Sequence, residues 1–447
     1  MSHERLSTVV ISGLTLTAIL FVGILIGKGG DRAGYASEPY EELQVFAEVL
    51  SQVKKHYVEE TNTKDLVQGA LRGMLAGLDP HSSFMTSDMF KEMQVETKGE
   101  FGGLGIQIGI KNNRLTVISP IEDTPAFEAG IQPGDTIIKV DDKPTKDLTL
   151  MEAVQQMRGP RGTSVQLTIE REGVENPLAF TLKRDIIKIQ SVRSKLLEGN
   201  LGYVRLSQFQ EATADDLTTE LEKLTSKEIQ GLIIDLRNNP GGLLTAAVGV
   251  SEQFLESGRL VVSIQGRNGK KDEYRARANS KNYQYPMIVL VNHGSASASE
   301  IVAAAMQDWG KAVVIGTTTF GKGSVQTILP LTDGSGLRLT TAKYYTPKGK
   351  SIHSIGVQPD IVIESKPAQL AKQEATEEKK DGNTENAQPP ATAKTPPPAS
   401  PPPTNSTPQN KENKDQAQPI PPDDIQLLKA VEMLKSWKVF KQLRPAA

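Results

Sequence analysis

A buried strand, a turn of small residues and a helix follow one another near residues 286–310, and this order constrains the fold most. Residues 286–291, Pro-Met-Ile-Val-Leu-Val, form a continuous apolar run that predicts a buried strand. Residues 292–300, Asn-His-Gly-Ser-Ala-Ser-Ala-Ser-Glu, form the turn, and apolar residues at helical spacing follow it as far as the stop signal Gly310. A hydroxyl in such a turn lies near a helix N-terminus, where unpaired N–H groups and the helix dipole favour a developing negative charge. The turn therefore suits a serine nucleophile.

A serine hydroxyl needs a base to take its proton. The chain has five histidines, and His293 lies too close in sequence to face the serine easily. Lys322 is the better candidate, because it lies between two glycines just after a second apolar strand at residues 312–315. A lysine in a dry pocket loses its charged form and becomes a base. Gln326, four residues on, is expected to hold the amine.

The two motifs together, Ser-Ala-Ser-Ala-Ser-Glu and Thr-Phe-Gly-Lys-Gly-Ser-Val-Gln, resemble those of the carboxyl-terminal processing peptidases, or tail-specific proteases. These are serine peptidases with a Ser-Lys dyad, a variant of the serine triad. The resemblance implies that Ser297 is the nucleophile, Lys322 the base and Gln326 the residue that orients the lysine. Each motif alone also fits a plain helix cap or a solvated loop, and it is the pair that favours catalysis.

A further apolar strand, residues 232–236, ends in Arg-Asn-Asn-Pro-Gly-Gly. Alternation of strands and helices here predicts an α/β layer. Paired glycines at a strand end allow backbone N–H groups to point into a site, as an oxyanion hole requires. The resemblance implies that this hole is formed by Gly242, with Gly241 as the near alternative, and by Ala298. The same residues also fit a simple turn.

Residues 96–184 have the pattern of one compact unit. A glycine-rich stretch enters an alternating strand at Ile106, and Thr149 with Glu152 three residues on predicts a capped helix. The order of strands, turns and helix resembles a PDZ domain. The resemblance implies that the glycine loop binds the C-terminal carboxylate of a peptide that adds to the sheet edge. The residues of this loop are Gly103, Leu104, Gly105 and Ile106.

The remaining segments flank these two units. Residues 6–27 are apolar and uncharged, which predicts a transmembrane anchor in preference to a cleaved signal sequence. Residues 39–95 predict an N-terminal helical region, through which the resembling family often dimerises. Residues 185–365 form the expected peptidase core, 366–422 a disordered Pro-rich linker, and 423–441 an amphipathic helix capped by Asp423 and Asp424.

The 51 basic and 53 acidic residues nearly cancel, so charge does not favour a nucleic-acid partner. No cysteine is present for a disulfide or a Cys-ligated zinc.

The expectation is an α/β (α+β) multidomain serine endopeptidase with a core of ββα layers and an inserted PDZ domain, without metal or cofactor. The resemblance implies a dimer in the bacterial inner membrane, with the catalytic part periplasmic. Its partners would be proteins with a free C-terminus, and an activating protein is left open. The alternative is a non-catalytic PDZ adaptor. A penicillin-interacting enzyme would need Ser-x-x-Lys, but Glu300 stands three residues after Ser297.

Overall fold

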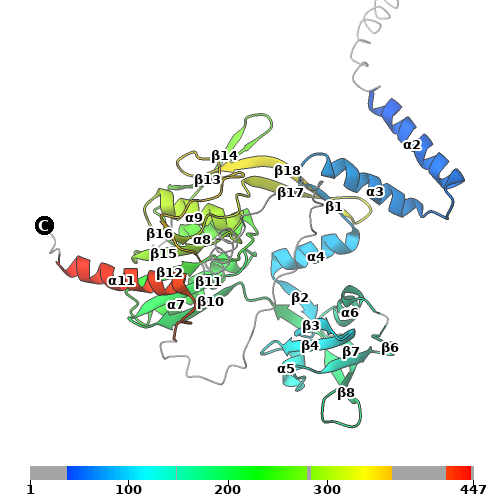
Figure 1. The fold of residues 1–447 in the computed structure, drawn as a ribbon, viewed down its shortest axis with the longest axis horizontal. Coiled ribbons are helices and arrows are strands. Elements are labelled where there is room, and N and C mark those ends of the chain that lie inside the picture. The colour runs from blue at the N-terminus through cyan, green and yellow to red at the C-terminus, as the bar shows by residue number, and fades with distance from the viewer. Residues whose placement is uncertain (1–37, 147, 279–282, 365–418, 444–447) are drawn as a thin grey trace, which may run out of the picture. The chain divides into compact units, whose positions relative to one another are not determined.

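The computed structural model describes residues 38–146, 148–278, 283–364 and 419–443 (Figure 1). They fall into two compact units, which divide between Phe84 and Met85. The expected membrane segment at 6–27 and nearly all of the expected linker at 366–422 lie outside the described residues. Within the described ranges, no helix is both long and apolar enough to cross a bilayer.

The first unit consists mainly of two helices, α2 (Glu38–His56) and α3 (Thr63–Ala76), and ends in β1 (Ser83–Met85) at the boundary. Both helices are predicted by the spacing of their apolar residues. Asn62 caps α3, because its side chain accepts a hydrogen bond of 2.9 Å from the Lys64 N–H. On α2 the apolar side chains of Leu43 and Phe46 are exposed.

The second unit begins with α4 (Ser87–Lys98), and the predicted PDZ elements follow. They are β2 (Glu100–Gly103), β3 (Ile106–Lys111), β4 (Arg114–Pro120), α5 (Pro125–Glu128), β5 (Thr136–Val140), β6 (Lys143–Pro144), α6 (Leu150–Met157), β7 (Ser164–Glu170), β8 (Leu178–Lys183) and β9 (Asp185–Lys188). The main sheet has the order β3-β4-β5-β7-β8, so β3 is an edge strand. The predicted capping box of α6 is confirmed: the Thr149 N–H donates to the Glu152 carboxylate and the Glu152 N–H to the Thr149 hydroxyl.

The rest of the second unit is built on a sheet of order β10-β11-β12-β15-β16-β19. Its elements are β10 (Val192–Leu197), β11 (Leu201–Leu206), α7 (Thr213–Thr225), β12 (Gly231–Asp235), α8 (Leu244–Glu252), β15 (Met287–Val291), α9 (Ala298–Asp308), β16 (Val313–Gly316), β19 (Ile361–Val362) and α11 (Ile425–Leu443). From β11 to β19 the strands are parallel. A second sheet contains β13 (Leu260–Gly266), β14 (Lys271–Arg275), β17 (Ser324–Pro330) and β18 (Gly336–Tyr345).

Helices cover both faces of the parallel sheet, which explains why its strands are apolar throughout rather than alternating. Successive side chains of a strand point to opposite faces. Leu232 and Ile234 pack in the cluster that includes α7, α8 and α9, whereas Ile233 packs with α11. Helix α11 lies in the region where the sequence predicts a C-terminal helix, and it covers the second face of the sheet.

Candidate active site

Three neighbouring strands bring the predicted site residues to one edge of the sheet. Strand β15 pairs with β12 on one side and with β16 on the other, and all three run parallel. Their carboxyl ends therefore lie together, which is where open α/β sheets bind ligands. The glycine turn at 236–242 follows β12, the serine turn at 292–297 follows β15, and the lysine loop at 317–323 follows β16.

Ser297 lies at the start of α9 in a backbone conformation that few side chains adopt. Its φ is 55° and its ψ is −113°. A positive φ at a residue other than glycine costs free energy and is maintained only by surrounding contacts. A sharp, strained turn between strand and helix also presents the nucleophile of α/β-hydrolases, although this chain lacks their flanking glycine motif.

Glu300 supplies the contacts that hold this turn, and the sequence analysis did not assign it a role. Its side chain is fully buried. One carboxylate oxygen accepts hydrogen bonds from the N–H groups of Ser297 (2.8 Å) and Lys322 (2.9 Å). The other accepts from the Gly321 N–H (2.7 Å) and the Thr319 hydroxyl (2.5 Å). A single carboxylate therefore joins the serine turn to the lysine loop. The Ser-x-x-Glu spacing of a capping box was the available sequence signal.

The Lys322 amine lies in surroundings that disfavour its charge. Burial lowers the pKa of Lys322, the positive charge of Arg338 lowers it further, and Glu300 opposes both effects. The structure shows no hydrogen bond between the Ser297 hydroxyl and the Lys322 amine. Only the neutral amine can accept a proton. Because the pKa of Lys322 is lowered, more of this amine is neutral at a given pH than in an ordinary surface lysine.

Gln326 lies on β17, close in sequence to the lysine loop. Its amide nitrogen donates to the hydroxyls of Ser324 (3.2 Å) and Thr340 (2.9 Å). Its buried carbonyl oxygen has no hydrogen-bond partner among the described residues. A buried acceptor without a donor is costly and marks a place where a donor is expected. The structure thus leaves an acceptor free on the side chain that the sequence assigned to the lysine.

The glycine turn distinguishes between the two candidate N–H donors. The Gly241 N–H already donates to the Asn239 side chain at 2.9 Å. Within the described ranges, neither the Gly242 N–H nor the Ala298 N–H is bonded to any group. A Cβ on Gly241 would lie 2.8 Å from the Ser297 Cβ and 2.9 Å from the Ala298 nitrogen, so the glycine turn packs closely against the serine turn. One unpaired donor therefore lies in each of two turns that pack against each other, which are the components that an oxyanion hole requires.

Tyr344, on β18, is a second residue that the sequence analysis missed. Its N–H donates to the Gly323 carbonyl at 3.0 Å, beside Lys322. Burial and the charge of Glu300 raise the pKa of Tyr344, while a contact with the Ser297 side chain opposes them. The buried hydroxyl completes no hydrogen bond with any described residue. No local pattern could have marked this tyrosine, because its neighbours at the site are distant in sequence.

His293, in contrast, is exposed, and its ring centroid lies 5.6 Å from that of Phe320. The structure shows no contact of His293 with Ser297 or Lys322, in agreement with its exclusion as the base.

The predicted peptide-binding loop lies between β2 and β3. Gly103 ends β2 and Ile106 begins β3, while the N–H groups of Leu104 and Gly105 have no hydrogen-bond partner in the part of the chain that the structure describes. Gly105 has a φ of 78°, and a Cβ there would lie 2.3 Å from Thr124. Free N–H groups next to an edge strand can bind a peptide carboxylate.

Arg158 lies outside this loop. Its guanidinium pairs with Glu92 of α4 at 2.5 Å and lies 4.5 Å from the centre of the Phe101 ring. The observed contacts connect it to α4.

Comparison with known proteins gives three family matches. The model described as peptidase family S41 matches residues 200–363, the PDZ domain model matches residues 92–170, and the model of the activating protease CtpB N-terminal domain matches residues 28–89.

Individual relatives agree with these matches. A carboxy-terminal-processing protease of Bartonella bacilliformis is 48% identical over 329 residues, which cover 73% of this chain and 76% of the relative. The carboxy-terminal processing protease CtpA of Bacillus subtilis is 38% identical over 360 residues, 80% of this chain and 76% of the relative. Among solved structures, a photosystem II D1 C-terminal processing protease is 31% identical, covers 72% of this chain and 92% of its own, and gives a TM-score of 0.42.

Proposed function

This chain belongs to the carboxy-terminal-processing proteases of peptidase family S41, and on that premise we propose that Ser297 is its nucleophile and Lys322 its general base. The protein is a serine peptidase with a PDZ domain that recognises substrates. The observation that carries the assignment is the buried carboxylate of Glu300, which accepts hydrogen bonds from the backbone N–H groups of Ser297 and Lys322. It supports a site in which the strained serine and the lysine act together.

In the proposed reaction, the neutral Lys322 amine takes the proton of the Ser297 hydroxyl as its oxygen attacks the scissile carbonyl. The N–H groups of Gly242 and Ala298 stabilise the oxyanion of the tetrahedral intermediate. The lysine returns the proton to the leaving amine, which leaves an acyl-enzyme, and water then hydrolyses the ester. The free carbonyl oxygen of Gln326 is available to orient the lysine amine.

Labelling with a fluorophosphonate tests this assignment directly, because the reagent phosphonylates an activated serine. We expect mass spectrometry of the digested protein to find the label on Ser297, and the Lys322→Met variant to react at least 100-fold more slowly. That factor is the order of magnitude that general-base catalysis contributes. Two results would contradict the proposal: label on another serine, or protein that takes up no label during the treatment and still cleaves peptides afterwards.

The rate of cleavage is expected to rise with pH as Lys322 loses its proton, with a midpoint below the ordinary lysine value of 10.5. Replacing Arg338 with glutamine removes a positive charge that disfavours the ammonium form, so the midpoint should move to higher pH. The pH profile of kcat/KM measures this midpoint. Arg275→Gln removes an exposed cation paired with Glu273 and should leave the midpoint in place. An unmoved midpoint in Arg338→Gln would exclude Lys322 as the titrating base.

We propose further that the N–H groups of Leu104 and Gly105 bind the substrate's C-terminal carboxylate, with Gly103 and Ile106 flanking them. Charge-assisted hydrogen bonds contribute about 1.5–3 kcal/mol, so amidating a peptide's C-terminus should weaken binding roughly 10- to 100-fold. Fluorescence anisotropy with the full-length Ser297→Ala variant measures this without cleavage. Equal affinity of free and amidated peptides would rule out carboxylate recognition.

The placement of the protein is proposed from its sequence. The uncharged run at 6–27 supports an anchor in the bacterial inner membrane, with the catalytic part in the periplasm. The exposed Leu43 and Phe46 on α2 support a dimer through the N-terminal helices. Alkaline extraction of membranes tests the first proposal, and release into the supernatant would contradict it. Sedimentation of the detergent-solubilised protein tests the second, which a monomer would contradict.

A further inference from the structure

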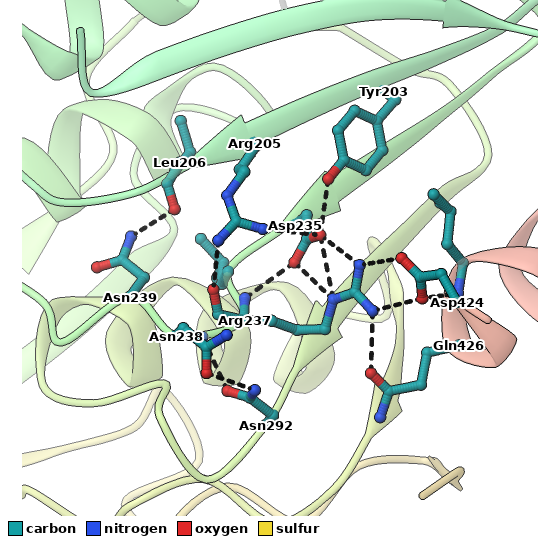
Figure 2. A network of polar contacts seen from close by, with 12 residues as sticks. Tyr203, Arg205, Leu206, Asp235, Arg237, Asn238, Asn239, Asn292, Asp424 and Gln426 are labelled. Atoms are coloured by element: carbon teal, nitrogen blue, oxygen red, sulfur yellow. Dashed lines mark hydrogen bonds and ion pairs between the residues drawn. The ribbon is translucent and has the colours of Figure 1, made fainter. Parts of the chain in front are cut away.

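Helix α11 lies outside the stretch matched by the S41 family, residues 200–363, yet it forms part of the same core. Leu427, Val431 and Leu434 pack against the face of the sheet that includes Ile233. The start of α11 is different, because Gln426 and Asp424, the residue before the helix, reach Arg237 in the glycine turn that follows β12 (Figure 2). A helix placed only to cover apolar surface would not need this polar end.

Arg237 binds the polar residues at this end of the helix. Its guanidinium donates to Asp424 at 2.6 and 2.8 Å and to the side-chain oxygen of Gln426 at 3.1 Å. From the other side, it donates to Asp235 at 2.6 Å. Gln426 in turn donates to the Ile363 carbonyl at 2.6 Å. The Arg237 side chain is 13% exposed and is therefore held between the core and α11 (Figure 2).

Asp424 contributes one of the two negative charges in this cluster, where Arg205 and Arg237 are the paired cations and Lys195 also interacts with both carboxylates. Asp235 is fully buried, accepts a hydrogen bond from the Tyr203 hydroxyl at 2.8 Å, and lies 3.6 Å from Arg205. Two arginines thus share one buried aspartate of the sheet, and Asp424 supplies the second negative charge. An incompletely paired buried guanidinium is costly, so it favours displacement toward solvent when its partner is removed.

Displacement of Arg237 would shift the rest of the glycine turn at 236–242, because Asn239 is only two residues away. The Asn239 carbonyl accepts hydrogen bonds from the Ala296 N–H (3.0 Å) and the Ser299 hydroxyl (2.9 Å), on either side of the nucleophile. Its side chain accepts the Gly241 N–H (2.9 Å). The segment that Asp424 fixes at one end therefore sets the position of the N–H donors relative to the serine turn.

We propose that α11 is a positioning element of the active site, in which Asp424 fixes Arg237 and thereby the place of the Gly242 N–H next to Ser297. This inference rests on the proposed function of Ser297 and Gly242. Asp424 itself touches neither of them. It acts through Arg237 and residues 238–241, so a change at Asp424 affects the stabilisation of the transition state rather than the binding of the tail.

Asp424→Asn in the full-length protein separates this role from helix formation. Asp424 also accepts the Leu427 N–H at 3.0 Å, at the start of α11, and asparagine caps helices as well as aspartate does. The variant therefore keeps the cap and loses the charge. Lys435→Gln is the matched control, because it removes another ion pair between α11 and the core, with Glu198 at 3.0 Å.

We expect Asp424→Asn to lower kcat for a peptide substrate about tenfold with KM within twofold, a factor consistent with slight misplacement of a catalytic group. Lys435→Gln should match the wild type in both constants. Arg237→Lys should lose a similar factor, and the double variant should lose no more than the worse single variant, because both changes act through one contact.

If Ser297→Ala is inactive, the proposed function stands. A wild-type kcat in Asp424→Asn, or a rise in its KM alone, would then overturn the inference about α11. Activity in Ser297→Ala would instead overturn the proposed function. If Asp424→Asn does not fold, Gln426→Ala removes a neutral acceptor from the same guanidinium. A roughly threefold fall in its kcat, about the value of one weak hydrogen bond, would then support the inference, and an unchanged kcat would overturn it.

Discussion

Replacing Ser297 with alanine is expected to lower kcat for peptide hydrolysis by roughly 10⁴- to 10⁶-fold, the order seen when a serine peptidase loses its nucleophile. The change should leave the fold intact, because the contact that holds the turn is made by the Ser297 N–H and not by its hydroxyl. Turnover of an unstructured protein with an apolar C-terminus measures the loss. A thermal unfolding curve matching the wild type is the control.

Lys322→Met should reduce kcat to a similar extent, and the double variant should be no worse than either single variant, because the two groups act in one step. The stability of the lysine variant gives a second readout. Since the folded state lowers the pKa of Lys322, the charged lysine costs stability at every pH below that value, and the cost fades as the pH rises to 10.5. Lys322→Met should therefore unfold at a higher temperature than the wild type near pH 7, and the gap should narrow in alkaline buffer. Cleavage by either single variant at the wild-type rate would refute the dyad.

Local patterns predicted most elements that carry the site. A continuous apolar run was enough for β15, helical spacing was enough for α9, and the Thr149 and Glu152 pair marked α6. These features depend on residues that are near one another in the chain, so propensity and periodicity contain the necessary information. The parallel order of β12, β15 and β16, which brings the three loops together, was not contained in any one of these patterns.

The connections within the site depend on residues that are distant in sequence, and the sequence did not reveal them. Glu300 was evident only as part of a motif, and its contact with Lys322 appears when β15 and β16 lie side by side. The choice between Gly241 and Gly242 needs the position of the Asn239 side chain. Such polar networks are set by tertiary packing, which single-sequence patterns do not encode.

Glu300→Gln is expected to be the most damaging substitution that removes no proposed catalytic group. The carboxylate accepts four hydrogen bonds, two on each oxygen. Glutamine offers one acceptor oxygen, and its amide NH₂ would face donors on the other side. A buried donor without an acceptor costs about 1–3 kcal/mol, so two such donors predict a loss of roughly 2–6 kcal/mol of unfolding free energy. Denaturant unfolding measures this loss.

The activity of Glu300→Gln should fall further than its folded fraction, by at least about 100-fold in kcat, because a shift of about 1 Å between nucleophile and base is enough for such a loss. Glu252→Gln is the matched control: Glu252 is also a buried helical carboxylate, but its partner is Arg277. That variant should lose stability with little change in the kcat of the folded fraction. A folded Glu300→Gln protein with wild-type kcat would mean that the Ser297 turn and the Lys322 loop keep their positions without the carboxylate, and the contact that carries the proposed dyad would lose its role.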